Sequence, residues 1–171
     1  MLFTYEGNII LSRLNELLKT YFMATGISIM AIDTQGNTLL SYGDSFDFCQ
    51  ILNDNTENAC NCQDSHLQAC KYAINVGEAY FFFCPHEFVN IAVPLVHQEK
   101  FLGGLLVGPL IVKTNTADFD SENFIKKRFP NLSKEKLAEI QDIFQQIPIT
   151  DPIRTNYLGN MLYMMASQEM E

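Results

Sequence analysis

The chain has 171 residues, of which 47% are apolar and none is Trp, and its 11 basic and 20 acidic side chains give a formal net charge of −9. A chain this long and this apolar can bury a core, so intrinsic disorder is excluded and one domain over residues 1–171 is expected. The acidic balance argues against nucleic-acid binding by this segment, because phosphate contacts need an excess of Lys and Arg.

The sequence also bears on the cellular compartment. No apolar run approaches the roughly 20 residues of a membrane helix, and the N-terminus lacks the basic region of a signal peptide. Five cysteines, an odd number, fit a secreted disulfide framework poorly. We therefore expect a cytoplasmic protein that does not bind a membrane.

The charges are unevenly placed along the chain. Residues 20–70 contain no Lys or Arg, and Lys71 is the one basic side chain in residues 20–99. A solvated acidic surface would have this pattern. A binding site in this stretch would suit a neutral or cationic ligand, or a metal ion, better than an anion.

The first half of the chain predicts a helix, a hairpin and two more helices. Apolar residues recur at helical spacing over residues 6–25, and Gly26 is a plausible helix stop. Two short β-rich runs, 27–33 and 38–43, flank a turn that contains Gly36, which indicates a hairpin. A short helix is expected over 47–53 and a longer one over 57–75.

Three strands are expected next, over residues 79–84, 88–96 and 101–112. Pro94 and Pro109 cannot donate to a strand ladder, so each should mark a bulge, an edge or a strand end. The pair Gly103-Gly104 indicates a bulge or a close backbone approach.

The last third reads as helical. One short helix should begin at Asp120 or Ser121, a second should be capped by Ser133, and a final helix over 152–170 should follow the N-cap Asp151. The fold class expected is α+β: a PAS-like, five-stranded antiparallel sheet with helices inserted between strands 2 and 3 and helices flanking it at both termini.

Cysteine and histidine residues cluster between positions 49 and 86. Cys62, His66 and Cys70 share one face of the helix predicted over 57–75, where they could bind a soft metal or simply be buried core residues. A second set comes from three different elements and could bind zinc or an iron–sulfur cluster, or line a pocket as free thiols. This second set is Cys49, Cys60, Cys84 and His86.

The aromatic strand AYFFFC offers a wall for a pocket. Because side chains alternate between the faces of a strand, Tyr80, Phe82 and Cys84 point to one side, and His86 joins them if the strand continues past Pro85. We predict that this set faces a pocket between the sheet and the inserted helices, although aromatic residues also fill ordinary cores.

A thiol-dependent enzyme is a further alternative, with Cys84 as nucleophile and His86 as base. No Gly-rich oxyanion turn or nucleophile elbow accompanies this pair, so we expect no enzymatic activity.

Several motifs occur in a characteristic order. They are Phe48-Cys49, Cys60-x-x-x-Asp64, Gly77 before the aromatic strand, Cys84-Pro85-His86, Ile91-Ala92-Val93-Pro94, Leu102-Gly103-Gly104 and Gly108. Over residues 8–165 this pattern resembles the PocR sensory domain family, whose PAS-like members are thought to sense small organic molecules such as diols and hydrocarbon derivatives. Pro85 departs from the family pattern, in which Cys is often followed directly by His.

The resemblance implies a role and a set of site residues. It marks Cys49, Cys60, Asp64, Cys84 and His86 as the polar cluster that binds a ligand, to which the strand parity adds Tyr80 and Phe82. It implies the sensory part of a bacterial transcriptional regulator or two-component signalling protein, with a linked effector domain. The flanking helices would then pair in a homodimer, and the C-terminal helix would relay ligand occupancy.

Overall fold

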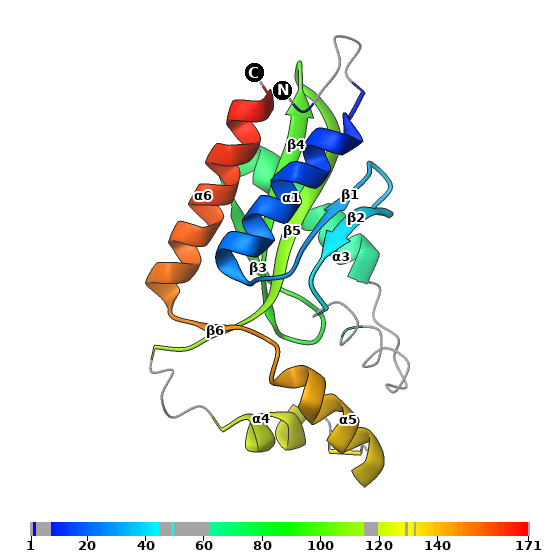
Figure 1. Ribbon diagram of the computed structural model, residues 1–171, viewed down its shortest axis with the longest axis vertical. Helices are drawn as coiled ribbons and strands as arrows, with labels where there is room; N and C mark the ends of the chain where they lie inside the picture. Colours follow the sequence, from blue (N-terminus) through cyan, green and yellow to red (C-terminus); the bar gives the residue numbers. More distant parts are fainter. Residues whose placement is uncertain are drawn as a thin grey trace.

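A computed structural model describes residues 2, 8–44, 49, 62–114, 120–128, 130–131 and 133–170. The elements follow one another in the order helix, hairpin, helix, three strands, two helices, a short strand and a final helix (Figure 1). They are α1 (Leu11–Thr25), β1 (Ile29–Ile32), β2 (Thr38–Tyr42), α3 (Cys62–Val76), β3 (Tyr80–Phe83), β4 (Val89–His97), β5 (Lys100–Val112), α4 (Ser121–Arg128), α5 (Lys134–Phe144), β6 (Ile149–Thr150) and α6 (Pro152–Met170).

The sheet has the strand order β2-β1-β5-β4-β3, and every pair along this path is antiparallel. The α+β class, the five antiparallel strands and the helix between β2 and β3 are confirmed. A further short strand that the sequence did not predict, β6, pairs with β5 in parallel. Two residues, Ile149 and Thr150, are too few to show a strand period in the sequence.

The two faces of the sheet are covered by different helices. Alternating strand residues such as Ile91, Val93 and Leu105 join α1 and α6 in one core cluster, whereas Ala92 and Leu106 point the other way, toward α3. Figure 1 shows α1 and α6 in front of the sheet and α3 behind it. Fully buried Tyr21 ties the two front helices together, since its hydroxyl donates to the carbonyl of Leu158 at 3.2 Å.

The prolines and glycines of the sheet behave as their chemistry requires. Pro94 lies in β4 beyond the part that pairs with β3, and Pro109 lies next to an irregularity in the β4–β5 register. A Cβ on Gly103 would lie 2.1 Å from the Ile32 carbonyl oxygen, and one on Gly104 would lie 2.2 Å from Cys70 Sγ. The close approach expected at this pair is confirmed, and it lets α3 pack directly on β5.

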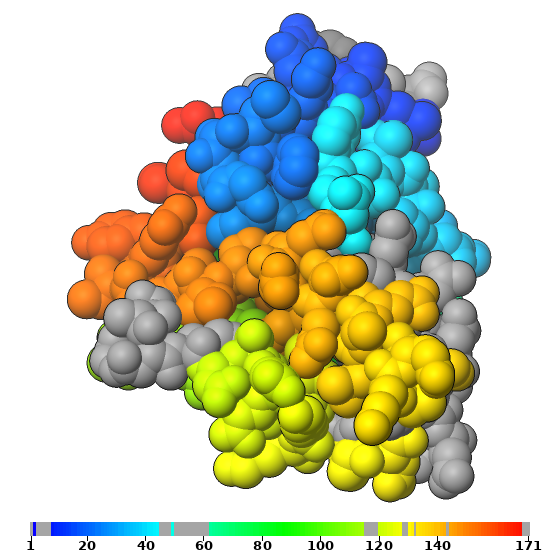
Figure 2. All heavy atoms as spheres, turned by 60° about the horizontal axis from the view of Figure 1, so that its bottom comes forward, coloured from blue at the N-terminus to red at the C-terminus, as the bar shows by residue number. Residues whose placement is uncertain are grey.

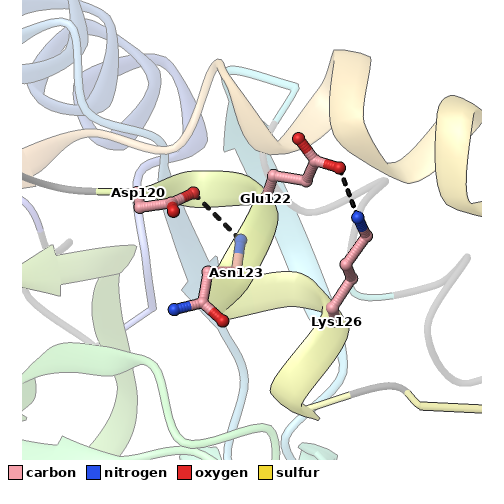
Figure 3. A network of polar contacts seen from close by, with 4 residues as sticks. All are labelled: Asp120, Glu122, Asn123 and Lys126. Carbon is pink, nitrogen blue, oxygen red and sulfur yellow. Dashed lines mark hydrogen bonds and ion pairs between the residues drawn. The ribbon is translucent and has the colours of Figure 1, made fainter.

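Helices α4 and α5 extend from one end of the sheet (Figure 1). They join Cys84 and Ile111 in a second core cluster, in which the rings of Phe88, Phe124 and Phe144 contact one another with centroids 5.5–6.0 Å apart. Asp120 caps α4 by accepting a hydrogen bond from the backbone N–H of Asn123 at 3.0 Å (Figure 3). Glu122 and Lys126, one turn apart, form an exposed ion pair on the same helix (Figure 3).

Most predicted helix ends are confirmed by their caps. Gly26 ends α1 in the left-handed conformation, Ser133 Oγ accepts from the Lys136 N–H, and Asp151 Oδ1 accepts from the Arg154 N–H. Helix α1 begins at residue 11 rather than 6, and no side chain caps its start. The helix predicted over 47–53 lies outside the described residues, apart from Cys49. In the part of the chain that the structure describes, no helix has both the length and the apolar character of a membrane span.

Candidate ligand-binding site

A cavity of about 390 Å³ opens between the N-terminal half of α3, the β1–β2 hairpin and the start of β4. This volume falls in the range of about 300–1,000 Å³ that is usual for small-molecule sites. The described residues that line it are Met30, Gly36, Asn37, Thr38, Cys49, Cys62, Gln63, His66, Cys84 and Asn90. They come from the β1–β2 hairpin, from the segment inserted between β2 and β3, and from residues that follow β3. The sequence predicted a pocket at this place, between the sheet and the inserted helices.

The hairpin turn forms one rim of the cavity and is held by Asp33. Its carboxylate accepts the backbone N–H groups of Gln35 and Asn37 at 2.8 and 2.9 Å, together with the Asn37 side-chain amide. These hydrogen bonds, the Asn37 side chain first, lower the pKa of Asp33. Gln63 on α3 then donates to the Gln35 carbonyl at 3.0 Å and to Asn37 Oδ1 at 3.1 Å, which fixes the helix to the turn.

Three thiols meet in the cavity, from three separate segments. Cys49 precedes α3, Cys62 is its first residue and Cys84 follows β3. Burial raises the pKa of Cys49 to about 12, with the neighbouring Cys84 and Cys62 as lesser causes. At neutral pH such a thiol is protonated, which is the opposite of the activation that a nucleophilic cysteine needs.

Cys84 sits in a network of hydrogen-bond donors. Burial raises its pKa, while hydrogen bonds from the backbone of Phe88 and His86 and from the Asn90 side chain act in the opposite direction. Asn90 is itself buried and donates to the Phe88 carbonyl at 3.2 Å. A Cβ on Gly108 would lie 2.5 Å from Asn90 Oδ1, so the glycine makes room for this amide. Cys84 and Asn90 therefore form a fixed polar end of the cavity.

His66 supplies the one imidazole of the described lining. Burial lowers its pKa to about 4, so the ring is neutral at physiological pH and has both a donor and an acceptor nitrogen. Its ring meets the edge of Phe82 with centroids 6.2 Å apart. The lining described here thus has hydrogen-bonding groups but no charged side chain, which suits a small neutral molecule with hydroxyl or carbonyl groups.

The residues predicted from the sequence fall into four groups. Cys49 and Cys84 line the cavity. Tyr80 and Phe82 stack on each other and pack on the core cluster of the α3 face, so they lie on the predicted side of the sheet, although neither is among the residues that line this cavity. Asp64 is exposed on α3 and His86 is buried, and neither lines the cavity. Cys60 lies outside the described residues.

Several lining residues were not among the predicted ligand-binding residues. Cys62 and His66 were assigned instead to a separate helix stripe, whose third member, Cys70, is buried against Gly104. Asn90 could have been found as the polar side chain in the otherwise apolar run FVNIAVPLV. Gln63 had no signal, since its role depends on a turn 26 or more residues away.

Cys60, one member of the metal-ligand set considered from the sequence, lies outside the described residues. Within the described ranges, no group of three or more His, Cys, Asp or Glu side chains has a geometry that could hold a metal ion. Cys49, Cys62 and Cys84 form no disulfide.

The sequence pattern of the family described as "Sensory domain found in PocR" matches residues 9–171, nearly the whole chain. The chain belongs to the PocR sensory domain family. The family assignment made from the ordered Cys, His and Gly motifs is thereby confirmed, and its members are sensory domains. A comparison with curated protein sequences finds no match.

Solved structures that resemble this PocR domain do so only distantly. A GAF domain/HD domain protein from Geobacter sulfurreducens has 11% identity and a TM-score of 0.37, over 92% of this chain and 93% of that one. The DhaR(N)–DhaL complex of E. coli has 13% identity and a TM-score of 0.33, over 93% and 51% of the two chains. The cofactor-binding GAF domain of the nutrient sensor CodY from Clostridium difficile has 10% identity and a TM-score of 0.24, over 70% and 88%.

Proposed function

We propose that this PocR domain senses a small neutral organic molecule, such as a diol or short alcohol, in the cavity between α3 and the β1–β2 hairpin. The observation that carries the proposal is the uncharged, hydrogen-bonding lining of that cavity, with a neutral His66 and the buried amide of Asn90. Hydroxyl groups can both donate to and accept from such groups, whereas a carboxylate or phosphate would find no cation among the described lining residues.

The contacts of the cavity wall also indicate how a bound ligand would affect the rest of the domain. Gln63 joins α3 to the hairpin turn, and Cys70 on the same helix packs on Gly104 of β5. A ligand that draws α3 and the hairpin together would therefore also bear on the central strand of the sheet. In this proposal a ligand shifts the output only through its different affinity for two states of the domain.

We further propose that α6 relays the signal to an effector domain and pairs with a second copy of the chain. Three large apolar side chains of α6 remain exposed, namely Ile153, Tyr157 and Met164, at 71%, 68% and 59%. Analytical ultracentrifugation should show a dimer that Tyr157→Glu converts to monomer. A wild-type chain that sediments as a monomer at high micromolar concentration would refute the pairing.

The ligand proposal is tested by a melting screen with a defined panel: ethylene glycol, propane-1,2-diol, glycerol, ethanol, acetate and inorganic phosphate. A molecule that binds the folded chain alone must raise its melting temperature by mass action. We expect a saturable rise with at least one neutral hydroxyl compound and none with the two anions. A rise with acetate or phosphate alone would contradict the neutral-ligand proposal.

A matched pair of variants locates the binding. His66→Leu removes the imidazole of the lining and should abolish the ligand-induced rise, whereas His97→Leu, at the far end of β4, should retain it. Equal responses of both variants would place the ligand elsewhere. Metal analysis of the purified chain serves as a further arm, since about one zinc or iron per chain would favour the metal-sensing alternative of Cys49, Cys60, Cys84 and His86.

A further inference from the structure

A second and larger cavity lies where α4, the beginning of α6 and the ends of β3, β4 and β5 come together. Its volume is about 570 Å³, and among the residues that the structure describes, none lines both this cavity and the one next to α3. Figure 2 shows the two helices that border it, the yellow-green α4 and the orange start of α6, on the same side of the molecule.

Five phenylalanine rings form part of the wall of this cavity. Phe81, Phe82 and Phe83 line it from β3, Phe88 lines it from the loop before β4, and Phe124 lines it from α4. The Phe81 ring packs on α6 at Gly159, where an added Cβ would lie 2.6 Å from its Cζ. Phe88 and Phe124 are held by contact with Phe144 of α5. These contacts hold Phe81, Phe88 and Phe124 in place.

Phe83 differs from the other four rings in its exposure. Its side chain is 72% exposed, although it lines the cavity and sits at the end of an edge strand. An apolar molecule bound in the cavity would cover this side chain and remove its apolar surface from water, which is favourable.

The polar groups near the cavity favour a neutral occupant. Glu87 and Lys113 bring opposite charges to its lining. The hydroxyl of Thr155 is hydrogen-bonded to the hydroxyl of Thr150 and to the Asp151 carbonyl, so it needs no hydrogen bond from a ligand.

We propose that this aromatic cavity is a second binding site, for a small neutral aromatic molecule of one or two rings. Aromatic rings attract one another in edge-to-face and offset arrangements at centroid distances of about 4.5–7 Å, which the five phenylalanines of the lining can provide. Because Pro152, Thr155 and Asn156 at the start of α6 form part of the wall, occupancy would bear directly on the base of that helix. The site stands independently of the proposed diol site.

Indole is the probe, because the chain contains no Trp and selective excitation of indole reports on the ligand alone. Titration of the full chain into indole should give a saturable blue shift of the emission. Phe83→Ala should weaken binding about three- to tenfold without unfolding an exposed position. Tyr72→Ala, which truncates an exposed aromatic residue of α3 outside the lining, should leave the affinity within twofold.

Two further arms decide between sites and between ligand classes. Cys62→Phe, which fills the cavity next to α3, should leave indole binding unchanged. Loss of binding in Cys62→Phe with full binding in Phe83→Ala would overturn the proposal, as would the absence of saturable binding in the wild-type chain. Displacement of indole by tetramethylammonium would show that the rings serve a cation, and would contradict the neutral ligand class.

Discussion

The two faces of the sheet use alternate residues of the same strands, yet they are covered in different ways. The face under α1 and α6 has a continuous core, with fully buried side chains such as Leu14, Leu18 and Ile91. The face under α3 has a smaller core around Cys70, and next to it lies the cavity with His66 and Asn90. One face thus provides stability, and the other leaves space and hydrogen-bonding groups for a ligand.

This difference arises from residue size and polarity at neighbouring strand positions. In β4, Ile91 and Val93 fill the α1/α6 face, whereas Asn90 and Ala92 are the residues that point toward α3. Small or polar residues at these two alternate positions leave space on the α3 face, while the other face stays closed except at its end beside α4, where Phe81 and Leu110 line the second cavity.

The largest effect is expected from truncating the closed face. Leu18→Ala should lower the free energy of unfolding by about 2–5 kcal/mol, because it leaves a cavity in a packed core. Met30→Ala, on the face that already has a cavity, should cost clearly less, since fewer contacts are lost. Urea unfolding of both variants checks this. Equal losses would remove the distinction between the faces.

A loss of about 1–3 kcal/mol is expected where α3 meets the sheet. Gly104→Ala would place a Cβ 2.2 Å from Cys70 Sγ, so the helix must move outward. Adding Cys70→Ala removes that sulfur and should recover part of the lost stability in a double-mutant cycle. Strictly additive losses would mean that α3 is not held by this contact.

Stability should also depend on pH through the buried imidazoles. Burial holds the pKa of His66 at about 4, below its ordinary value near 6.5, and burial lowers the pKa of His86 as well. The unfolded chain therefore binds more protons between pH 6.5 and 4, so stability is full above about pH 6.5 and falls as pH drops toward 4. His66→Gln should flatten this decline in a melting series, and an unchanged slope would count against a buried, neutral His66.

The smallest effect is expected in the rate at which the buried cysteines are alkylated, and it does not concern the stability of the fold. Burial raises the pKa of Cys49 and Cys70 to about 12 and raises that of Cys84, so little thiolate is present at pH 7. Iodoacetamide should alkylate these three residues at least about tenfold more slowly in the folded chain than in urea, as followed by peptide mass spectrometry. Rapid labelling of Cys84 in the folded chain would revive the thiol-enzyme alternative.

The fold could be predicted from the sequence because its signals are local. Asp151 before Pro152, Ser133 before a helix and the Gly36 turn each fix an element by its own neighbours. The start of α1 was predicted five residues too early, because the apolar spacing extends into the residues that precede the first turn of the helix. Strand β6 was missed because it depends on pairing with β5 and not on its own two residues.

The site could be predicted only in part, because a cavity depends on tertiary distances. Cys84 was selected by strand parity and does reach the cavity, and Cys49, which the family resemblance suggested, lines it as well. His66 was set aside as part of a helix stripe, since nothing in its spacing shows which turn of α3 lies over a cavity and which over Gly104. Asn90 needed the buried position that only the folded sheet defines.

The central claim, that the α3 face carries the sensory site, is tested most directly by a crystal structure of the chain with the panel compound that gives the largest melting shift. The account predicts ligand density bonded to the Asn90 amide or the His66 imidazole, beside Cys84. Density confined to the aromatic cavity beside α4 and α6, with the cavity next to α3 empty, would contradict it.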